Sequence, residues 1–255
     1  MKFEQHLPSE LLRNYISHYI IAENITPQIY KVFPSQGLVI GFQYLGKLIK
    51  ITPNGSIPLH SSGVTGITDS FLEFQNAENT GTVLVYFTEI GFTHFCSTPA
   101  HELFNQSVGL ELLFDRRQVE ELEEKLSNCF ADSQRIRHVD QFFKNQLKQV
   151  VTDRLIVEAV RQIYASKGAI RIQELIQHLG ISQSPFEKRF RKMVGTSPKK
   201  FASIVRFNTV LNSLDSEKSL TDICFENHFF DQAHFIKDFK RFTGDTPEQF
   251  KNNSK

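Results

Sequence analysis

Two clusters of polar and basic side chains carry the clearest chemistry in this 255-residue sequence. The first cluster comprises Gln183, Ser184, Glu187, Lys188 and Arg191, and the second comprises Gln232, Ala233, Ile236 and Lys237. A glutamine amide pairs with adenine in bidentate fashion, a lysine ammonium reaches guanine or phosphate, and a glutamate accepts from the amino group of cytosine. Each side chain alone also fits an ordinary exposed helix position. The joint pattern favours a surface that reads DNA base edges.

Both clusters lie in a repeated unit. Five apolar and turn residues recur with a displacement of 49 positions: Phe186, Phe190, Gly195, Pro198 and Phe201 match Phe235, Phe239, Gly244, Pro247 and Phe250. Upstream, Ile172, Leu175 and Ile176 match Leu220, Ile223 and Cys224 at a displacement of 48, so the second copy has one extra residue in its turn. Each copy predicts a helix, a tight turn and a second helix.

In the first unit, Gly180 provides positive φ at the turn, and Ser182 or Ser184 caps the second helix. If the cap is Ser184, Pro185 takes the first helical position and Glu187 completes a capping box. Inward positions on this helix are Phe186, Phe190 and Met193. The side chains of the first cluster would therefore face outward.

The second unit follows the same plan. Ser219 caps its first helix, its second helix buries Phe235, Phe239 and Phe242, and Gly244 ends that helix. A connecting helix that starts at Ser197-Pro198 joins the units through Phe201, Ile204, Val205, Leu211 and Leu214. A helix-turn-helix places the N-terminal end of its second helix in the major groove, so the outward clusters become base-reading candidates.

A family resemblance rests on four segments: Gly195-Thr-Ser-Pro-Lys-Lys-Phe201 with Arg206, Ser219-Leu-Thr-Asp-Ile-Cys224, Phe235 to Gly244, and Thr246-Pro247. Over roughly 153–250 the sequence closely resembles the AraC/XylS family of bacterial regulators. The resemblance implies two recognition helices in successive major-groove segments of double-stranded DNA, with Arg206 steadying the assembly or touching phosphate. Two residues depart from the family pattern, Cys224 at a small-residue position and His228 at a glycine position.

The first ninety residues favour strands. Their β-branched and aromatic runs are 15–21, 30–33, 38–45, 47–51, 71–75 and 82–87. Such short strands suggest a small antiparallel barrel or sandwich, and the family resemblance implies a cupin-like sensor barrel. Helices follow at about 99–104, 116–130 and 132–150. The fold class is therefore α+β, with a sensor or dimerisation domain over 1–150 and an all-α DNA-binding domain over 151–255.

Two features of the N-terminal part each have two interpretations. The apolar stripe Ile136, Val139, Phe143, Leu147 and Val150 either packs on its own barrel or forms a coiled-coil dimer seam. The aromatic residues of the strands either form a plain core or line a pocket for a small apolar or aromatic effector. These aromatic residues are Phe33, Phe42, Tyr44, Phe71, Phe74, Tyr86 and Phe87.

No catalytic or metal site is expected, because His60, His94 and His101 lack the close spacing of cupin metal ligands. Cys96, Cys129 and Cys224 show neither a disulfide framework nor a zinc pattern, and no cofactor motif occurs. A barrel enzyme that carries a DNA-targeting module is the main alternative, and a protein-interaction adaptor is another. Partner expectations are DNA, RNA polymerase, a small effector and a homodimer.

The charge is unevenly distributed. From Asp153 onward there are 17 Lys/Arg and 12 Asp/Glu, whereas the preceding residues have 12 and 16. A basic C-terminal part suits a polyanion partner, because only the binding face gains from positive potential. No apolar run approaches the roughly 18 residues of a membrane span, so we expect a cytoplasmic protein without membrane contact.

Overall fold

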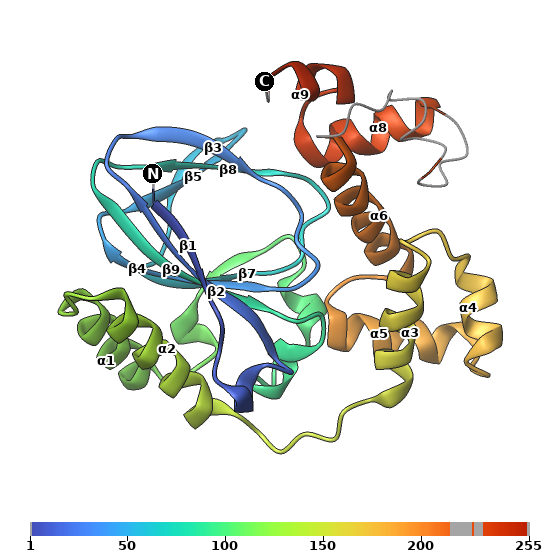
Figure 1. Cartoon of the computed structure of the whole chain (residues 1–255). Coiled ribbons are helices and arrows are strands. Elements are labelled where there is room, and N and C mark those ends of the chain that lie inside the picture. The colour runs from blue at the N-terminus through green and yellow to red at the C-terminus, as the bar shows by residue number, and fades with distance from the viewer. Residues whose placement is uncertain (1, 215–225, 227–231, 254–255) are drawn as a thin grey trace.

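Strands occupy the first part of the chain and helices the last part, as the α+β prediction requires (Figure 1). The computed structural model describes residues 2–214, 226 and 232–253, without the side chains of Gln232, His234 and Asn253. We call 2–146 the N-terminal region and 154–253 the C-terminal region. No helix among the described residues has the length and apolar character needed to cross a membrane.

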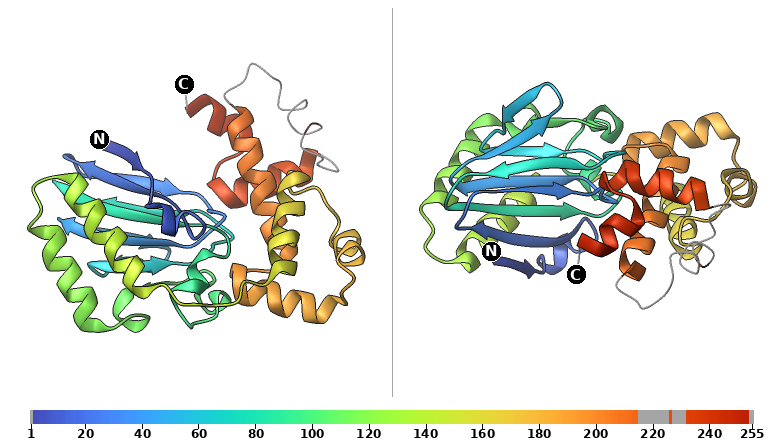
Figure 2. Two further views of the ribbon diagram at one scale, coloured as in Figure 1. Left: turned by 60° about the horizontal axis from the view of Figure 1, so that its bottom comes forward. Right: turned by 90° about the horizontal axis from the view of Figure 1, so that it is seen from above.

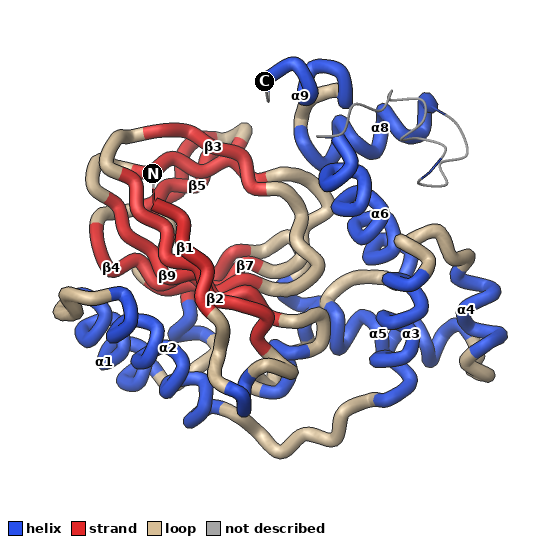
Figure 3. The backbone as a smooth tube through the Cα atoms, viewed as in Figure 1, coloured by secondary structure: helices blue, strands red, loops and turns tan. Residues whose placement is uncertain are grey.

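The strands form two antiparallel sheets that face each other (Figures 1 and 3). The six-stranded sheet has the order β1 (Lys2–His6), β2 (Ile16–Asn24), β9 (Thr80–Phe87), β4 (Val39–Leu45), β7 (Ser62–Thr65) and β10 (Ser107–Gly109). The four-stranded sheet has the order β3 (Gln28–Val32), β8 (Leu72–Asn76), β5 (Leu48–Thr52) and β6 (Gly55–Pro58). Among the described residues no strand pairs across the two sheets, so the predicted barrel is an open sandwich rather than a closed cylinder.

Alternation along β9 shows how the six-stranded sheet divides two environments. Successive side chains of a strand point to opposite faces. Val83 and Val85 are fully buried beneath helices, whereas Leu84 and Tyr86 face the space between the sheets. Pairing of β9 with β2 and β4 places it at the centre of the sheet.

All six predicted strands are present, but four others were not predicted. These are β1, β6, β7 and β10. The turn signals at 53–55 and 61–63 overlap β6 and β7, and β10 has only three residues. The strands β6, β7 and β10 have at most four residues, too few for an alternating pattern to show. Strand β1 is as long as β3, but it is mostly polar and exposed, and its pairing with β2 decides its structure.

The helices α1 (Arg116–Ser127) and α2 (Asp132–Gln146) cover the outer face of the six-stranded sheet (Figure 2). In α2, Val139 and Phe143 are fully buried, and the Phe143 ring lies 5.4 Å from that of Phe87. The expectation that this stripe packs on its own strands is therefore confirmed. Val150, the last residue of the predicted stripe, lies beyond the helix and is 45% exposed. Four short 3-10 helices complete the N-terminal region: η1 (Glu10–Leu12), η2 (Gly91–His94), η3 (Ala100–Leu103) and η4 (Leu110–Leu112).

The C-terminal region consists of α3 (Arg154–Ala165), α4 (Ile172–His178), α5 (Gln183–Val194), α6 (Pro198–Leu214), α8 (Gln232–Thr243) and α9 (Pro247–Asn253). The repeated phenylalanines form its core, since Phe186, Phe190, Phe235 and Phe239 are at most 1% exposed. Gly180, Gly195 and Gly244 all have positive φ, as the sequence predicts for the turn and the two helix ends.

Asp153 directly precedes the C-terminal region and has two structural roles. Its carboxylate caps α3 by accepting from the backbone amides of Leu155 and Ile156, at 3.1 and 3.3 Å. The same carboxylate accepts two hydrogen bonds from the Arg189 guanidinium of α5, at 2.7 and 2.6 Å. These bonds from Arg189, helped by the backbone amides, lower the pKa of Asp153 below its ordinary value.

We expect Asp153→Ala to lower the free energy of unfolding by about 1–2 kcal/mol near neutral pH, because it removes the helix cap. Asp153→Asn should lose less, since asparagine keeps a capping oxygen. The folded-state pKa is depressed, so this stabilisation is full above about pH 4 and disappears as the pH falls through the folded pKa. Urea titrations at several pH values measure it, and a wild-type advantage that persists or grows in acid would contradict the assignment.

Candidate nucleic-acid interface

Helix α5 presents the first cluster to solvent, with Arg191 in its last turn and the other members nearer its N-terminal end. Gln183, Ser184, Lys188 and Arg191 are exposed, while Glu187 is half-buried and accepts a 2.9 Å hydrogen bond from Gln183. Phe186 and Phe190 point the opposite way into the core. The helix therefore has one apolar and one polar, mostly basic face, which is the division a recognition helix needs.

The start of α5 differs from one of the two capping alternatives. Ser182 takes the N-cap position, without a hydrogen bond from its side chain, and the helix begins at Gln183. Ser184 and Pro185 therefore lie inside the first turn, and the capping box of Ser184 with Glu187 is wrong. A serine that can cap and a proline with its fixed φ both suit the start of a helix. The sequence alone therefore did not distinguish a start after Ser182 from a start after Ser184.

The second recognition helix, α8, repeats the arrangement. Ala233 and Lys237 are exposed, Ile236 is 37% exposed, and Phe235 and Phe239 are buried behind them. Gln232 is the first residue of α8. The first helix of this second unit was predicted around Ser219, Leu220, Asp222, Ile223 and Cys224, and these residues and His228 lie outside the described residues.

Both α5 and α8 contact the N-terminal region at their C-terminal ends. A Cβ atom added at Gly195, after α5, would lie 3.2 Å from the carbonyl oxygen of Ala100. One added at Gly244, after α8, would lie 2.9 Å from the ring of Phe71. Figures 1 and 2 show the N-terminal ends of α5 and α8 on the side remote from the sheets. The ends that would enter DNA are thus not covered by the N-terminal region.

Arg206 lies apart from the exposed clusters. It is half-buried on α6, and burial lowers the pKa of its guanidinium although the carboxylate of Asp238 on α8 opposes that shift. An arginine placed between α6 and α8 suits the steadying role better than a phosphate contact. Asn208, two residues further along α6, donates to the carbonyl oxygen of Pro34 at 3.2 Å.

Ion pairs join the two regions. Lys31 of β3 pairs with Asp245 beyond α8 at 2.7 Å, and Lys200 of α6 pairs with Asp69 at 2.5 Å. Burial of Asp69 opposes ionisation, but its hydrogen bonds from Lys200 and Asn105 outweigh that effect, so its pKa lies below the ordinary value. These contacts hold the C-terminal region in a defined orientation on the sheets.

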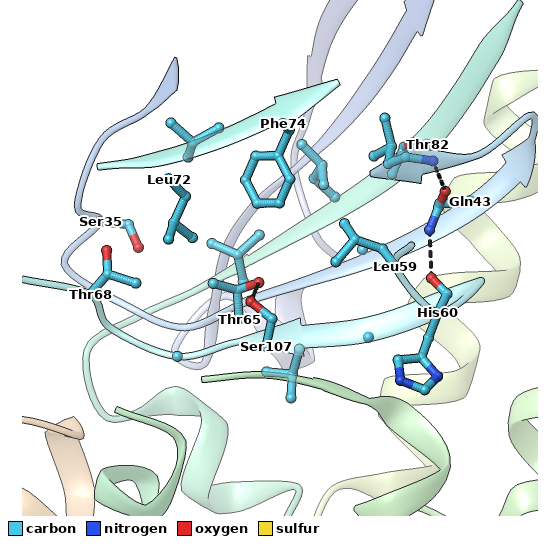
Figure 4. A pocket seen from close by; sticks show the side chains of 18 of the residues that line it. Ser35, Gln43, Leu59, His60, Thr65, Thr68, Leu72, Phe74, Thr82 and Ser107 are labelled. Atoms are coloured by element: carbon cyan, nitrogen blue, oxygen red, sulfur yellow. Dashed lines mark hydrogen bonds between the residues drawn. The ribbon is translucent and has the colours of Figure 1, made fainter. Parts of the chain in front are cut away.

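The space between the two sheets contains a cavity of about 200 Å³ (Figure 4). Phe33, Phe74 and Tyr86 line it, as the pocket interpretation of the aromatic residues requires. The other predicted aromatics do not: Phe42 and Phe87 contact Phe143 of α2, Tyr44 donates to Glu23, and Phe71 lies beside Gly244. Adjacent aromatic residues of one strand point to opposite faces of the sheet. The prediction considered only which residues are aromatic, and so it did not distinguish the two faces.

Phe33 connects this cavity to the C-terminal region. Its ring lines the cavity and lies 6.3 Å from the ring of Phe207 on α6 and 5.6 Å from that of Phe250 on α9. Pro34, the next residue, accepts the hydrogen bond from Asn208. Phe33 and Pro34 therefore connect the cavity to α6 and α9 of the C-terminal region.

Sequence reasoning missed the residues that join the regions and part of the cavity lining. The ion-paired Lys31, Asp69, Lys200 and Asp245 are ordinary surface types in the sequence, and only the fold brings them together. Tyr30 and Leu48 had a usable signal, because they occupy the inward positions of β3 and β5.

Two of the histidines considered as metal ligands have partners within the protein. His60 lies 3.4 Å from the carboxylate of Glu111, and His94 is buried and forms a hydrogen bond with Thr152.

Comparison with known proteins gives two family matches. Residues 175–253 match the model of a helix-turn-helix domain, and residues 4–109 match a domain of unknown function, DUF6597. Uncharacterized HTH-type transcriptional regulators of Staphylococcus aureus strains MSSA476 and MRSA252 are each 30% identical over 83 residues, which is 32% of this chain. The chain spans 11% of the length of these curated relatives.

Among solved structures, ToxT from Vibrio cholerae strain SCE256, with an unsaturated fatty acid bound, has a TM-score of 0.50 and 11% identity, and covers 96% of both chains. That likeness shows a shared fold. The xylose-binding transcription activator XylR is 18% identical with a TM-score of 0.36 over 46% of this chain and 39% of its own.

The fold and the match of its C-terminal part define a protein with a helix-turn-helix domain and an N-terminal region of two sheets. Within that class, residues 175–253 match a helix-turn-helix domain of the AraC type. The helix-turn-helix match does not favour the alternative of a small-molecule enzyme.

Proposed function

We propose that the chain is a sequence-specific transcription regulator. The exposed N-terminal ends of α5 and α8 read successive segments of the major groove, and the cavity between the sheets takes a small effector. The single observation that carries the proposal is that the N-terminal ends of α5 and α8 point away from the sheets (Figures 1 and 2), while their C-terminal ends contact the N-terminal region. An arrangement of this kind leaves both reading ends accessible to one duplex.

The cavity supports the regulatory half of the proposal. It lies between the sheets, and Phe33 lines it while also contacting Phe207 and Phe250 of the C-terminal region. ToxT, the neighbour of similar fold, has been solved with an unsaturated fatty acid bound. Occupancy of the cavity would change DNA affinity by altering how the regions contact each other, since a ligand shifts an equilibrium only by its preference for one state.

Selection of bound sequences from random DNA, with and without a metabolite extract, tests this function. We expect an enriched motif with two half-sites, because two recognition helices read it, and a shift in affinity with the extract. The absence of an enriched motif would contradict sequence-specific regulation. An enriched motif that no extract affects would contradict only the effector role.

Affinity for the selected site should fall steeply with salt, because each neutralised phosphate releases about 0.9 counterions. A lysine that contacts phosphate contributes about one to the slope of log K against log salt. We expect Lys188→Ala to weaken binding and to leave the slope almost unchanged, because the proposal assigns Lys188 to base reading; a slope lowered by about one would assign it to phosphate. Fluorescence anisotropy between low and physiological salt measures the slope, and a wild-type affinity independent of salt would contradict DNA binding through this basic face.

A further inference from the structure

A row of side chains on the four-stranded sheet places a lysine beside the cavity. The strand register pairs Tyr30 with Phe74 and Phe74 with Lys50, and all three side chains lie on the same face of the sheet. Tyr30 and Phe74 line the cavity, and so does Leu48, two residues before Lys50. The side chain of Lys50 therefore leaves the backbone on the inner face of the sheet, next to the apolar lining.

The ammonium of Lys50 reaches across to the opposite sheet. Its Nζ atom lies 3.5 Å from the hydroxyl oxygen of Ser107 on β10, and that oxygen lies 3.2 Å from the hydroxyl of Thr65 on β7. Ser107 and Thr65 both line the cavity, where Figure 4 shows their hydroxyls in contact. The ammonium of Lys50, which is not itself a lining residue, thus lies beside two hydroxyl groups of the cavity wall.

The charge of Lys50 is not compensated by a neighbouring acid. In the part of the chain that the structure describes, Lys50 forms no ion pair, and partial burial lowers the pKa of its ammonium. A cation that has lost water and gained no anion is a favourable position for an anionic ligand, because the ligand restores the lost interaction. None of the described lining residues is an aspartate or glutamate that would repel such a ligand.

Most of the remaining lining is apolar and offers little to a charged group. It includes Phe33, Leu72 and Phe74, and two of its polar residues, Gln43 and Ser35, are engaged within the protein. Gln43 donates to the carbonyl of His60 and accepts from the amide of Leu48, and Ser35 donates to the carbonyl of Gly37. A ligand that matches this division has an apolar body and one anionic end.

We propose that the cavity binds a small carboxylic acid whose carboxylate accepts hydrogen bonds from Lys50, Ser107 and Thr65, and whose apolar body lies against Phe33 and Phe74. A cavity of about 150 Å³ admits benzene, so one of about 200 Å³ holds a ring with a short side chain. The inference rests on the proposed function only for the effect of the acid on DNA binding, because binding itself is measured without DNA.

Isothermal titration calorimetry of the full chain tests the proposal with three acids, each paired with its neutral amide: phenylacetate, 3-phenylpropionate and hexanoate. We expect at least one acid to bind about tenfold or more tightly than its amide, since hydrogen bonds to a charged group are roughly twice as strong as neutral ones. Lys50→Met should abolish that preference, and Lys50→Arg should retain it. Ser107→Ala should reduce it, which provides a second variant with a small change in volume.

The matched control is Lys47→Met, which removes the same charge from an exposed position in the turn before β5. It should bind acids and amides as the wild type does. An amide that binds as tightly as its acid, a preference that survives in Lys50→Met, or no binding by any acid of the panel would each overturn the proposal. An acid that binds without changing the affinity for DNA would support the proposed binding site and contradict only the effector role.

Discussion

Replacement of Lys188 and Lys237 together by alanine should weaken binding to the selected DNA site by about 2–6 kcal/mol, since each base-reading contact contributes roughly 1–3 kcal/mol. Both lysines are exposed, on equivalent positions of α5 and α8. The two contributions should add, because the positions lie on two separate helices, α5 and α8. Fluorescence anisotropy with the selected duplex and with a scrambled duplex measures the loss.

The matched control removes two lysines that lie far from the recognition helices. Lys47→Ala with Lys125→Ala makes the same change in net charge, and both side chains are exposed in the N-terminal region. This control should reduce affinity only slightly and equally on both duplexes. Equal losses on the selected and scrambled duplexes for the recognition-helix variant would show phosphate contact in place of base reading, and no loss would exclude these faces as the interface.

Truncation of either repeated core phenylalanine should destabilise the C-terminal region strongly. Phe190 is completely buried, and its ring lies 5.7 Å from the rings of Phe186 and Phe201. Phe239 is 1% exposed and lies 5.7 Å from Phe207. Phe190→Ala and Phe239→Ala should each cost about 3–5 kcal/mol, because a large buried side chain is lost and a cavity remains.

Urea titration of each variant measures that cost as the free energy of unfolding. Phe130→Ala is the matched control, since Phe130 is completely exposed at the turn between α1 and α2 and its loss opens no cavity. The control should unfold at the wild-type urea concentration. A loss under 1 kcal/mol at Phe190 or Phe239 would mean that the repeat does not build the core in the way its packing indicates.

The C-terminal region was predictable because its sequence repeats. Phe190 and Phe239, and Gly195 and Gly244, occupy equivalent positions at one displacement, and each needs the same backbone and burial in both copies. A regular apolar period and a glycine at a helix end are local signals that neighbouring residues enforce. The helix start at Ser182 was less determined, because two serines close together both fit a cap.

The N-terminal region was predictable in its strands but not in their pairing. Alternation identified the longer strands, yet β10 with Ser107 escaped because three residues carry no period. The roles of Phe42 and Phe33 also depended on strand phase: one lies beneath α2 and the other lines the cavity. A shift of one residue exchanges the two faces of a strand, and register is decided by partners distant in sequence.

The sequence alone determined the repeated helical units, the polar faces of their recognition helices and the AraC-type character of the C-terminal region, since all of these follow from spacing within short segments. Only the tertiary structure decided that both reading ends point away from the sheets, that Phe33 joins the cavity to α6 and α9, and that Lys50 meets Ser107 and Thr65. These relations bring together side chains that are far apart in sequence, and such contacts depend on how whole sheets and helices pack.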